Sequence, residues 1–242
     1  MMRSIRPVAV YWRSPPAAPA AAPSQLEVIL RSAKIVVEPG RSADTVPAYR
    51  AYTYDFALRQ PGILAVRLLR SLTMPNKFFV HSWWDSVASM EAAADSPDYE
   101  RVLDSAQRDF LERMSVWTLD VLDPDPRPPL PADPSLVVSR LVKVTLRPNV
   151  AHDIEGLYRR VTEDYTRRQP GCLRVQLFRD RRLRNVYFVQ SYWTDAAKMM
   201  AAIESDQLHA IREEAAHYLE ERMGVWVLEI VADSERMSLF RA

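Results

Sequence analysis

Three side chains near the C-terminal end of the chain have types and a spacing suited to acid–base chemistry. His209, Arg212 and Glu213 stand together in the segment "HAIREEAAH". On a helix His209 and Glu213 are i,i+4 neighbours, so they form either a surface ion pair or an acid–base pair. In the second case Arg212 would anchor a phenolate or a carboxylate. We take these three residues as the candidate catalytic group, with the surface ion pair as the alternative.

A second candidate feature is the segment "NVYFVQSYWTD", which begins at Asn185. In a strand its residues Tyr187, Ser191 and Trp193 point to the same face of the sheet. Aromatic walls beside a hydroxyl suit an aromatic ligand. Core packing is the alternative, because large aromatic side chains are usually buried.

The chain contains two copies of one sequence pattern. A constant difference in residue number, here called the repeat offset, relates each position of the first copy to its counterpart in the second. The repeat offset carries "RQPG" at 59–62 onto "RQPG" at 168–171, and Trp84 onto Trp193. About a third of the positions in 31–122 are identical to those of the second copy, without a gap, which is far beyond chance. The sequence therefore predicts two copies of one structural unit.

The first copy of the aromatic segment is "NKFFVHSWWDS". In a strand Ser82 and Trp84 share one face, whereas His81 and Trp83 share the other. His81 corresponds to Gln190 in the second copy, another neutral hydrogen-bonding side chain. We therefore predict a hydrogen-bonded His81 at an interface between sheets.

Each copy has the pattern strand, helix, strand, strand, helix, strand. The strands are short and rich in β-branched residues, and Pro-Gly follows each first helix. Tyr165 lies on the inward stripe of the first helix of the second copy, where it lines a site or packs in the core. The predicted strands are 32–39, 63–70, 78–84 and 116–122, then 139–148, 172–179, 187–193 and 225–231; the helical regions are 44–59, 87–113, 153–168 and 196–222, and the region 87–113 is expected to break near Pro97.

This order is the ferredoxin-like βαββαβ unit, an α+β fold in which helices cover one face of a four-stranded sheet. The other face needs a partner, so we predict that the two units pack sheet to sheet as an α+β barrel within one chain. The predicted parts are an N-terminal arm (1–26), a first domain (27–122), a proline-rich linker (123–135), a second domain (136–233) and a C-terminal tail (234–242).

Composition excludes several classes of function. Of 242 residues, 32 are basic and 31 acidic, and this balance gives no electrostatic case for nucleic acid. The single cysteine allows no internal disulfide, and no apolar run approaches the roughly 20 residues of a membrane span. No HExxH, GxGxxG or P-loop motif is present, which disfavours a metal enzyme and a resident dinucleotide. We expect a cytoplasmic protein.

The unit resembles the antibiotic biosynthesis monooxygenase family. The likeness lies in "QPG" before the second strand, and in a third strand that ends in "WDS" or "WTD" before a helix rich in Ala and Met. The resemblance implies dimeric α+β barrel proteins, among them anthrone oxygenases that use neither metal nor tightly bound flavin. The fused layout is similar to that of the oxygenases that open the B ring of angucyclinones.

The resemblance places the strand-three Trp, here Trp84 and Trp193, on the helix side of the sheet beside Ser82 and Ser191. Arg212 is similar to a pocket arginine of the family. Two family positions are not kept: a pocket Asn is replaced by Val80 and Val189, and a pocket Tyr by Met90 and Met199. The candidate substrate-binding residues are Trp193, Trp84, Tyr187, Ser191, Tyr165, Met199 and Ser82.

The resemblance implies an oxygenase that tailors an aromatic polyketide, an angucyclinone or an anthrone-like phenol, with O2 as cosubstrate. Ring opening would also need an electron donor such as loosely held reduced flavin. The alternatives are a non-catalytic ligand-binding or scaffold protein and a polyketide cyclase of the same barrel type. A homodimer remains open. The second copy is the better-equipped one, because the first has Glu100, Leu103 and Asp104 where the second has His209, Arg212 and Glu213.

Overall fold

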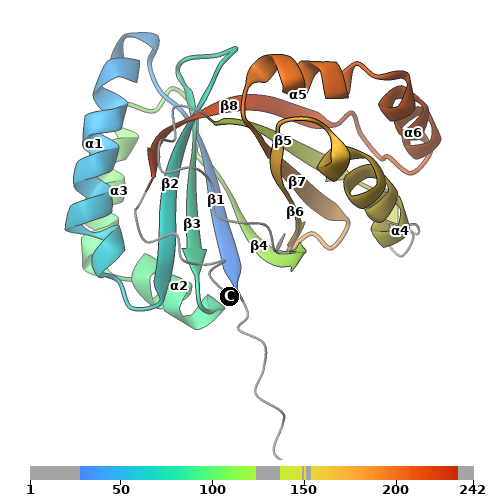
Figure 1. The fold of residues 1–242 in the computed structure, drawn as a ribbon. Coiled ribbons are helices and arrows are strands. Elements are labelled where there is room, and N and C mark those ends of the chain that lie inside the picture. The colour runs from blue at the N-terminus through green and yellow to red at the C-terminus, as the bar shows by residue number, and fades with distance from the viewer. Residues whose placement is uncertain (1–27, 124–136, 149, 151–153, 234–242) are drawn as a thin grey trace, which may run out of the picture.

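The computed structural model describes residues 28–123, 137–148, 150 and 154–233 (Figure 1). The predicted arm, the predicted tail and the predicted linker apart from Asp123 lie outside these residues. Among the described residues, no helix is long and apolar enough to cross a membrane.

The two halves repeat one order of elements, as predicted. The first half contains β1 (Ile29–Val36), η1 (Pro39–Arg41), α1 (Ser42–Asp55), η2 (Ala57–Arg59), β2 (Ile63–Ser71), β3 (Lys77–Trp84), α2 (Val87–Ala94), α3 (Pro97–Gln107) and β4 (Ser115–Asp123). The second contains β5 (Val138–Thr145), α4 (Ile154–Arg159), η5 (Arg160–Tyr165), η6 (Thr166–Arg168), β6 (Cys172–Asp180), β7 (Val186–Trp193), α5 (Ala196–Ile203), α6 (Asp206–Ala216) and β8 (Gly224–Asp233).

The eight strands form a closed antiparallel barrel in the order β1-β3-β2-β8-β5-β7-β6-β4. The halves join edge to edge, because β2 pairs with β8 and β4 pairs with β6. Closure leaves none of these eight strands with an edge open to another chain. The helices of each half lie on the outside of its own sheet (Figure 1). This arrangement confirms the predicted α+β barrel of two fused units.

Both seams between the halves carry the same ion pair. Arg70 contacts Glu229 at 2.7 Å across β2 and β8. The repeat offset relates this pair to Arg179 and Asp120, which stand 3.9 Å apart across β4 and β6. Such partly exposed pairs contribute little free energy, so we interpret them as register markers that orient the two edges.

The second helical region is broken in both halves, whereas the sequence predicted a break only at Pro97. Ser96 begins α3 and Ser205 begins α6, and each hydroxyl accepts a hydrogen bond from the backbone N–H three residues later, at 3.2 Å. The serine N-cap is thus sufficient to start a new helix without a proline.

The first helix differs between the halves. The sequence predicted one regular helix over 153–168, but η5 is a π-helical turn between α4 and η6. At its end, the Thr166 hydroxyl donates to the Val161 carbonyl at 2.6 Å, a span of five residues. In the first half, α1 is a continuous 14-residue α-helix. π-turns often occur at functional sites, and this one lies in the second half.

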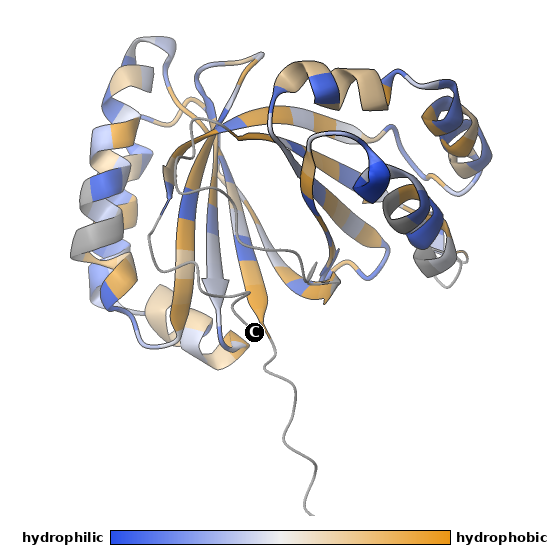
Figure 2. Ribbon diagram, viewed as in Figure 1, coloured by the Kyte–Doolittle hydropathy of each residue, from blue (hydrophilic) through white to orange (hydrophobic). Residues whose placement is uncertain are grey.

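Two kinds of core correspond to the two faces of the strands. Hydrophobic residues colour much of the barrel wall in Figure 2. Phe79, Trp83 and Tyr192 belong to the core inside the barrel. Trp84 belongs to a separate cluster beneath α2, and Trp193 to one beneath α5. The predicted division of the aromatic segment between its two faces is therefore confirmed.

The barrel interior also contains charge. Arg67 is fully buried and donates to Asp233 at 2.8 Å, which links β2 to β8. Its guanidinium carbon lies 5.4 Å from the ring centre of Trp83 and 5.1 Å from that of Tyr192. A buried arginine is stabilised by such stacking and pairing, because its charge is not left without partners when it is removed from water.

His81 lies inside the barrel, as predicted, but the predicted hydrogen bond is absent. Neither ring nitrogen has a partner among the described residues. Its neighbours in register are Ser32 on β1 and Arg67 on β2. Burial, followed by the charge of Arg67, lowers the pKa of His81 to about 3, so the ring is neutral.

Candidate active site on the helix side of the second sheet

The predicted aromatic wall lies between the sheet and α5. Trp193 is buried against Met199 and Ala202. Its indole Nε1–H donates to the Ser191 hydroxyl at 2.9 Å. The hydrogen bond fixes the plane of the ring. The first half repeats this arrangement, since Trp84 packs on Met90 and donates to Ser82 at 2.9 Å.

A strand arginine that the sequence did not single out lies beside this wall. Arg140 of β5 is paired in register with Ser191 of β7. Its neighbours on β5, Ser139 and Leu141, are fully buried on the barrel side, so Arg140 points toward the helices. Its Nε is buried and has no hydrogen-bond partner among the described residues.

Arg212 of α6 approaches Arg140 from the helix layer. Burial, followed by the like charge of Arg212, lowers the pKa of Arg140 to about 10. Burial also lowers the pKa of Arg212, which is half-buried. Within the described residues neither guanidinium has a salt bridge to a carboxylate. The two arginines therefore leave positive charge without a described carboxylate partner on the helix side of the second sheet.

Tyr165 and Tyr187 take different places around this pair. Tyr165 ends η5, and its hydroxyl lies 2.5 Å from both the Ala202 carbonyl and the Ser205 hydroxyl. It therefore ties the first helix to the turn between α5 and α6. Tyr187 is buried in a cluster beneath α4 that includes Tyr158.

The remaining two members of the candidate catalytic group are separated from the site. His209 and Glu213 are exposed on α6, whereas Arg212 is half-buried. No ion pair joins His209 to Glu213 among the described contacts, so the surface-pair alternative is not formed either. The structure thus brings together Trp193, Ser191 and Met199. It places Arg212 near Arg140 and leaves His209 and Glu213 exposed.

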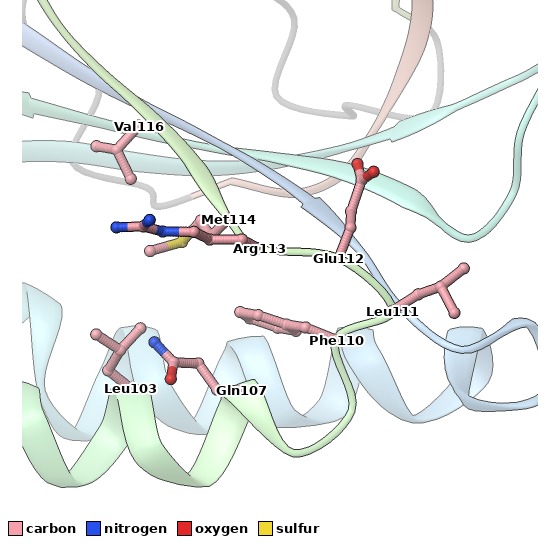
Figure 3. A pocket seen from close by; sticks show the side chains of 8 residues that line it. All are labelled: Leu103, Gln107, Phe110, Leu111, Glu112, Arg113, Met114 and Val116. Carbon is pink, nitrogen blue, oxygen red and sulfur yellow. The ribbon is translucent and has the colours of Figure 1, made fainter.

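A hollow of about 580 Å³ lies in the first half, between the C-terminal end of α3 and the start of β4 (Figure 3). Phe110, Leu103 and Gln107 face Arg113, Met114 and Val116 across it. The polar residues Gln107 and Arg113 are exposed, as is Val116. The hollow is therefore a surface feature, and it contains none of the predicted site residues. We do not take it as the active site.

A metal centre finds no support in the described part of the chain. It contains no group of three or more His, Cys, Asp or Glu side chains placed to hold a metal ion.

One sequence signal could have identified Arg140. The repeat offset pairs it with Arg31, so the same arginine occurs at the same place on both first strands. Charged residues on the buried face of a strand are uncommon, and a repeated one is a candidate for function. The hydrophobic pattern of "LRSAKI" and "SRLVKV" indicates only strands, and by itself it does not draw attention to the arginine that both contain.

Comparison with known proteins agrees with this architecture. The family model for antibiotic biosynthesis monooxygenase matches residues 29–104 and again 137–214. No curated protein matches the chain.

Several solved structures have the same fold at low sequence identity. A candidate monooxygenase of Lactobacillus acidophilus NCFM superposes with a TM-score of 0.66 at 10% identity, covering 87% of this chain and 97% of its own. One of Fusobacterium nucleatum subsp. nucleatum ATCC 25586 has a TM-score of 0.70 at 11% identity, covering 86% and 94%. An anthrone oxidase-like protein has a TM-score of 0.71 at 9% identity, covering 89% and 95%.

The family model matches both halves of the chain, at the segments that carry the strand arginines and the strand-three tryptophans. The chain therefore belongs to the antibiotic biosynthesis monooxygenase family, as a monooxygenase with two fused copies of the family's domain.

Proposed function

We propose that this monooxygenase oxidises a polycyclic phenol of the anthrone or angucyclinone type, an aromatic polyketide, at the helix side of the second half. The observation that carries the proposal is the pair Arg140 and Arg212, which lacks a counter-ion within the described part of the chain. Arg140 lies next to Ser191, which fixes the Trp193 indole, and Arg212 adds a second positive charge. Such a set suits a flat aromatic ring that bears a phenolate oxygen.

The charge of the pair has a chemical consequence. A phenol that loses its proton becomes electron-rich enough to react with O2, and a neighbouring cation lowers the free energy of that anion. Arg140 and Arg212 would stabilise the phenolate, and Trp193 would hold the ring in place. Because Arg140 is half-buried and its Nε is fully buried, the interaction is stronger than at the surface.

The overall reaction balances without a resident cofactor when the product is a quinone. The reacting methylene loses two hydrogens and gains one oxygen atom of O2, and the second oxygen atom leaves as water. Ring opening by oxygen insertion needs two further electrons and two protons. A reduced flavin would supply them as a cosubstrate.

Oxygen uptake tests the proposal. The purified full chain is mixed with 1,8-dihydroxyanthrone or with an angucyclinone, each with and without reduced flavin, and O2 and products are measured. We expect uptake with at least one substrate above the rate without protein. Consumption of a substrate without O2 would favour the cyclase, and no consumption of any substrate would favour a binding protein; either result contradicts the proposal.

A further inference from the structure

In the first half, the phenol group of Tyr99 lies against the strand arginine Arg31. Arg31 Nη2 donates to the Tyr99 hydroxyl at 2.5 Å. The guanidinium carbon of Arg31 also lies 5.0 Å from the centre of the Tyr99 ring. A guanidinium that both donates to a phenol oxygen and contacts its ring is satisfied in two ways at once.

The second half keeps the arginine and lacks the phenol. The repeat offset carries Arg31 onto Arg140 and Tyr99 onto Leu208. Leu208 is buried on the sheet side of α6 and offers no hydrogen-bonding group. Arg140 is left with a buried Nε that no described residue satisfies. A buried donor without a partner is unfavourable, and a ligand that accepts a hydrogen bond from it removes that cost.

No other tyrosine of the site replaces the missing phenol. Tyr165 stands where the first half has Phe56, which packs on Tyr99 at 5.9 Å between ring centres. The Tyr165 hydroxyl is engaged by Ala202 and Ser205 instead. Among the described residues, the place that Tyr99 fills in the first half is thus filled by no phenol in the second.

We propose that Arg140 binds the phenol oxygen of the substrate in the way that Arg31 binds Tyr99, and that Tyr99 acts as a built-in ligand that closes the first half. Each chain then binds one phenol, in its second half. This inference rests on the proposed function for the location of the site. It adds the binding mode and the number of sites.

Exchanging the two helix residues tests the inference. Bound ligand is counted by anaerobic equilibrium dialysis of the full chain against 1-naphthol, with naphthalene as the control that lacks the hydroxyl. We expect one bound 1-naphthol per chain, two for Tyr99→Leu and none for Leu208→Tyr. The double variant should return to one, now held in the first half. Naphthalene should bind at least about tenfold more weakly.

Two further variants separate the roles of ring and hydroxyl. Tyr99→Phe keeps the ring in place, so it should still bind one 1-naphthol. Circular dichroism and thermal melting verify folding; if Leu208→Tyr does not fold, Tyr99→Leu alone decides between one site and two. An unchanged count in Tyr99→Leu, or full binding in a folded Leu208→Tyr, would overturn the inference.

The dialysis experiment tests the binding mode and the oxygen-uptake experiment tests the proposed function, so either proposal can fail without the other. A count that follows the exchange without oxygen uptake supports the binding mode and contradicts the proposed function. Oxygen uptake together with a number of bound 1-naphthol molecules that does not change in the Tyr99 and Leu208 variants supports the proposed function and contradicts the binding mode.

Discussion

The two halves of this chain have the same fold and the same tryptophan-serine pair, but they differ in what faces the strand arginine. In the first half Tyr99 satisfies Arg31, and Leu103 stands one turn further along α3. In the second half Leu208 and Arg212 stand at these two positions. Two differences on one helix thus distinguish the halves. In the first, the strand arginine is hydrogen-bonded to a tyrosine, and in the second, a second arginine stands near it.

This difference shows how a fused repeat divides its tasks. Both halves keep the hydrophobic clusters, which stabilise the closed barrel, and the seam ion pairs, which orient its edges. The polar groups between sheet and helices are free to diverge, since each half packs its helices on its own sheet. We infer that one half retains the chemistry while the other supplies the second sheet of the barrel.

The largest effect is expected inside the barrel, where the first half has Arg67 and the second Gln176. Asp233→Ala removes a carboxylate that pairs with the fully buried Arg67. We expect a loss of about 3 kcal/mol in the free energy of unfolding, measured by urea denaturation.

The matched control is the double variant Arg67→Gln with Asp233→Ala, which reproduces the neutral side chain of the second half. It should be more stable than Asp233→Ala alone. If the single variant unfolds like the original chain, the interior ion pair does not hold the β2–β8 seam.

Replacing the strand arginine of each half tests whether the two halves differ in catalytic activity. Arg140→Leu removes the proposed contact to the phenolate, and a charge-assisted hydrogen bond of about 1.5–3 kcal/mol corresponds to roughly a 10- to 100-fold loss of kcat/KM. Its counterpart Arg31→Leu should leave kcat/KM within about twofold, because Arg31 serves Tyr99. Equal losses in both variants, measured by oxygen uptake, would show that the halves share the reaction.

The acid response of stability should come partly from His81, which the second half replaces by Gln190. The folded state keeps His81 neutral, so only the unfolded state binds a proton below the ordinary pKa of 6.5. Stability should therefore fall as pH drops from about 6.5 toward about 3, by up to about 1.4 kcal/mol per pH unit. His81→Gln should flatten this part of the profile, as measured by denaturation at several pH values. A profile that keeps its slope would assign the acid response to other groups.

The smallest expected effect concerns the glycines of the two Pro-Gly turns. Gly62 and Gly171 have φ of 79° and 81°, and an alanine there costs about 1–2 kcal/mol in backbone strain. A Cβ at Gly62 would lie 2.4 Å from Ser89 Cβ, whereas at Gly171 it would meet the flexible Lys198 chain at 2.5 Å. Thermal melting should therefore rank Gly62→Ala as the less stable variant. The opposite order would mean that the first turn relaxes more easily than the second.

Much of the fold could be predicted because the chain repeats itself. Period-two patterns placed the strands, and the repeat showed which apolar positions are kept in both copies. The π-turn of η5 was missed, since it depends on a local hydrogen bond between Thr166 and Val161 and not on hydrophobic periodicity. The hydrogen bond expected for His81 is not formed with any described residue, because its neighbours in register are Ser32 and the cationic Arg67, and neither bonds to the ring.

The candidate site was only partly predictable. Trp193 and Ser191 are hydrogen-bonded to each other beneath α5, and Arg212 lies on α6 near Arg140. His209 and Glu213 were chosen with Arg212 from their spacing along the chain. On α6 both side chains are exposed.

The sequence by itself determined the repeat, the order of elements, the barrel class and the division of the aromatic segment between two strand faces. These features follow from periodicity and from self-comparison. Only the tertiary structure decided that the charge of Arg212 acts on Arg140, and that Tyr99 bonds to Arg31. Those contacts join a strand to a helix across a packed layer. Their distances depend on how far and at what angle the helix sits above the sheet, which no spacing along the chain specifies.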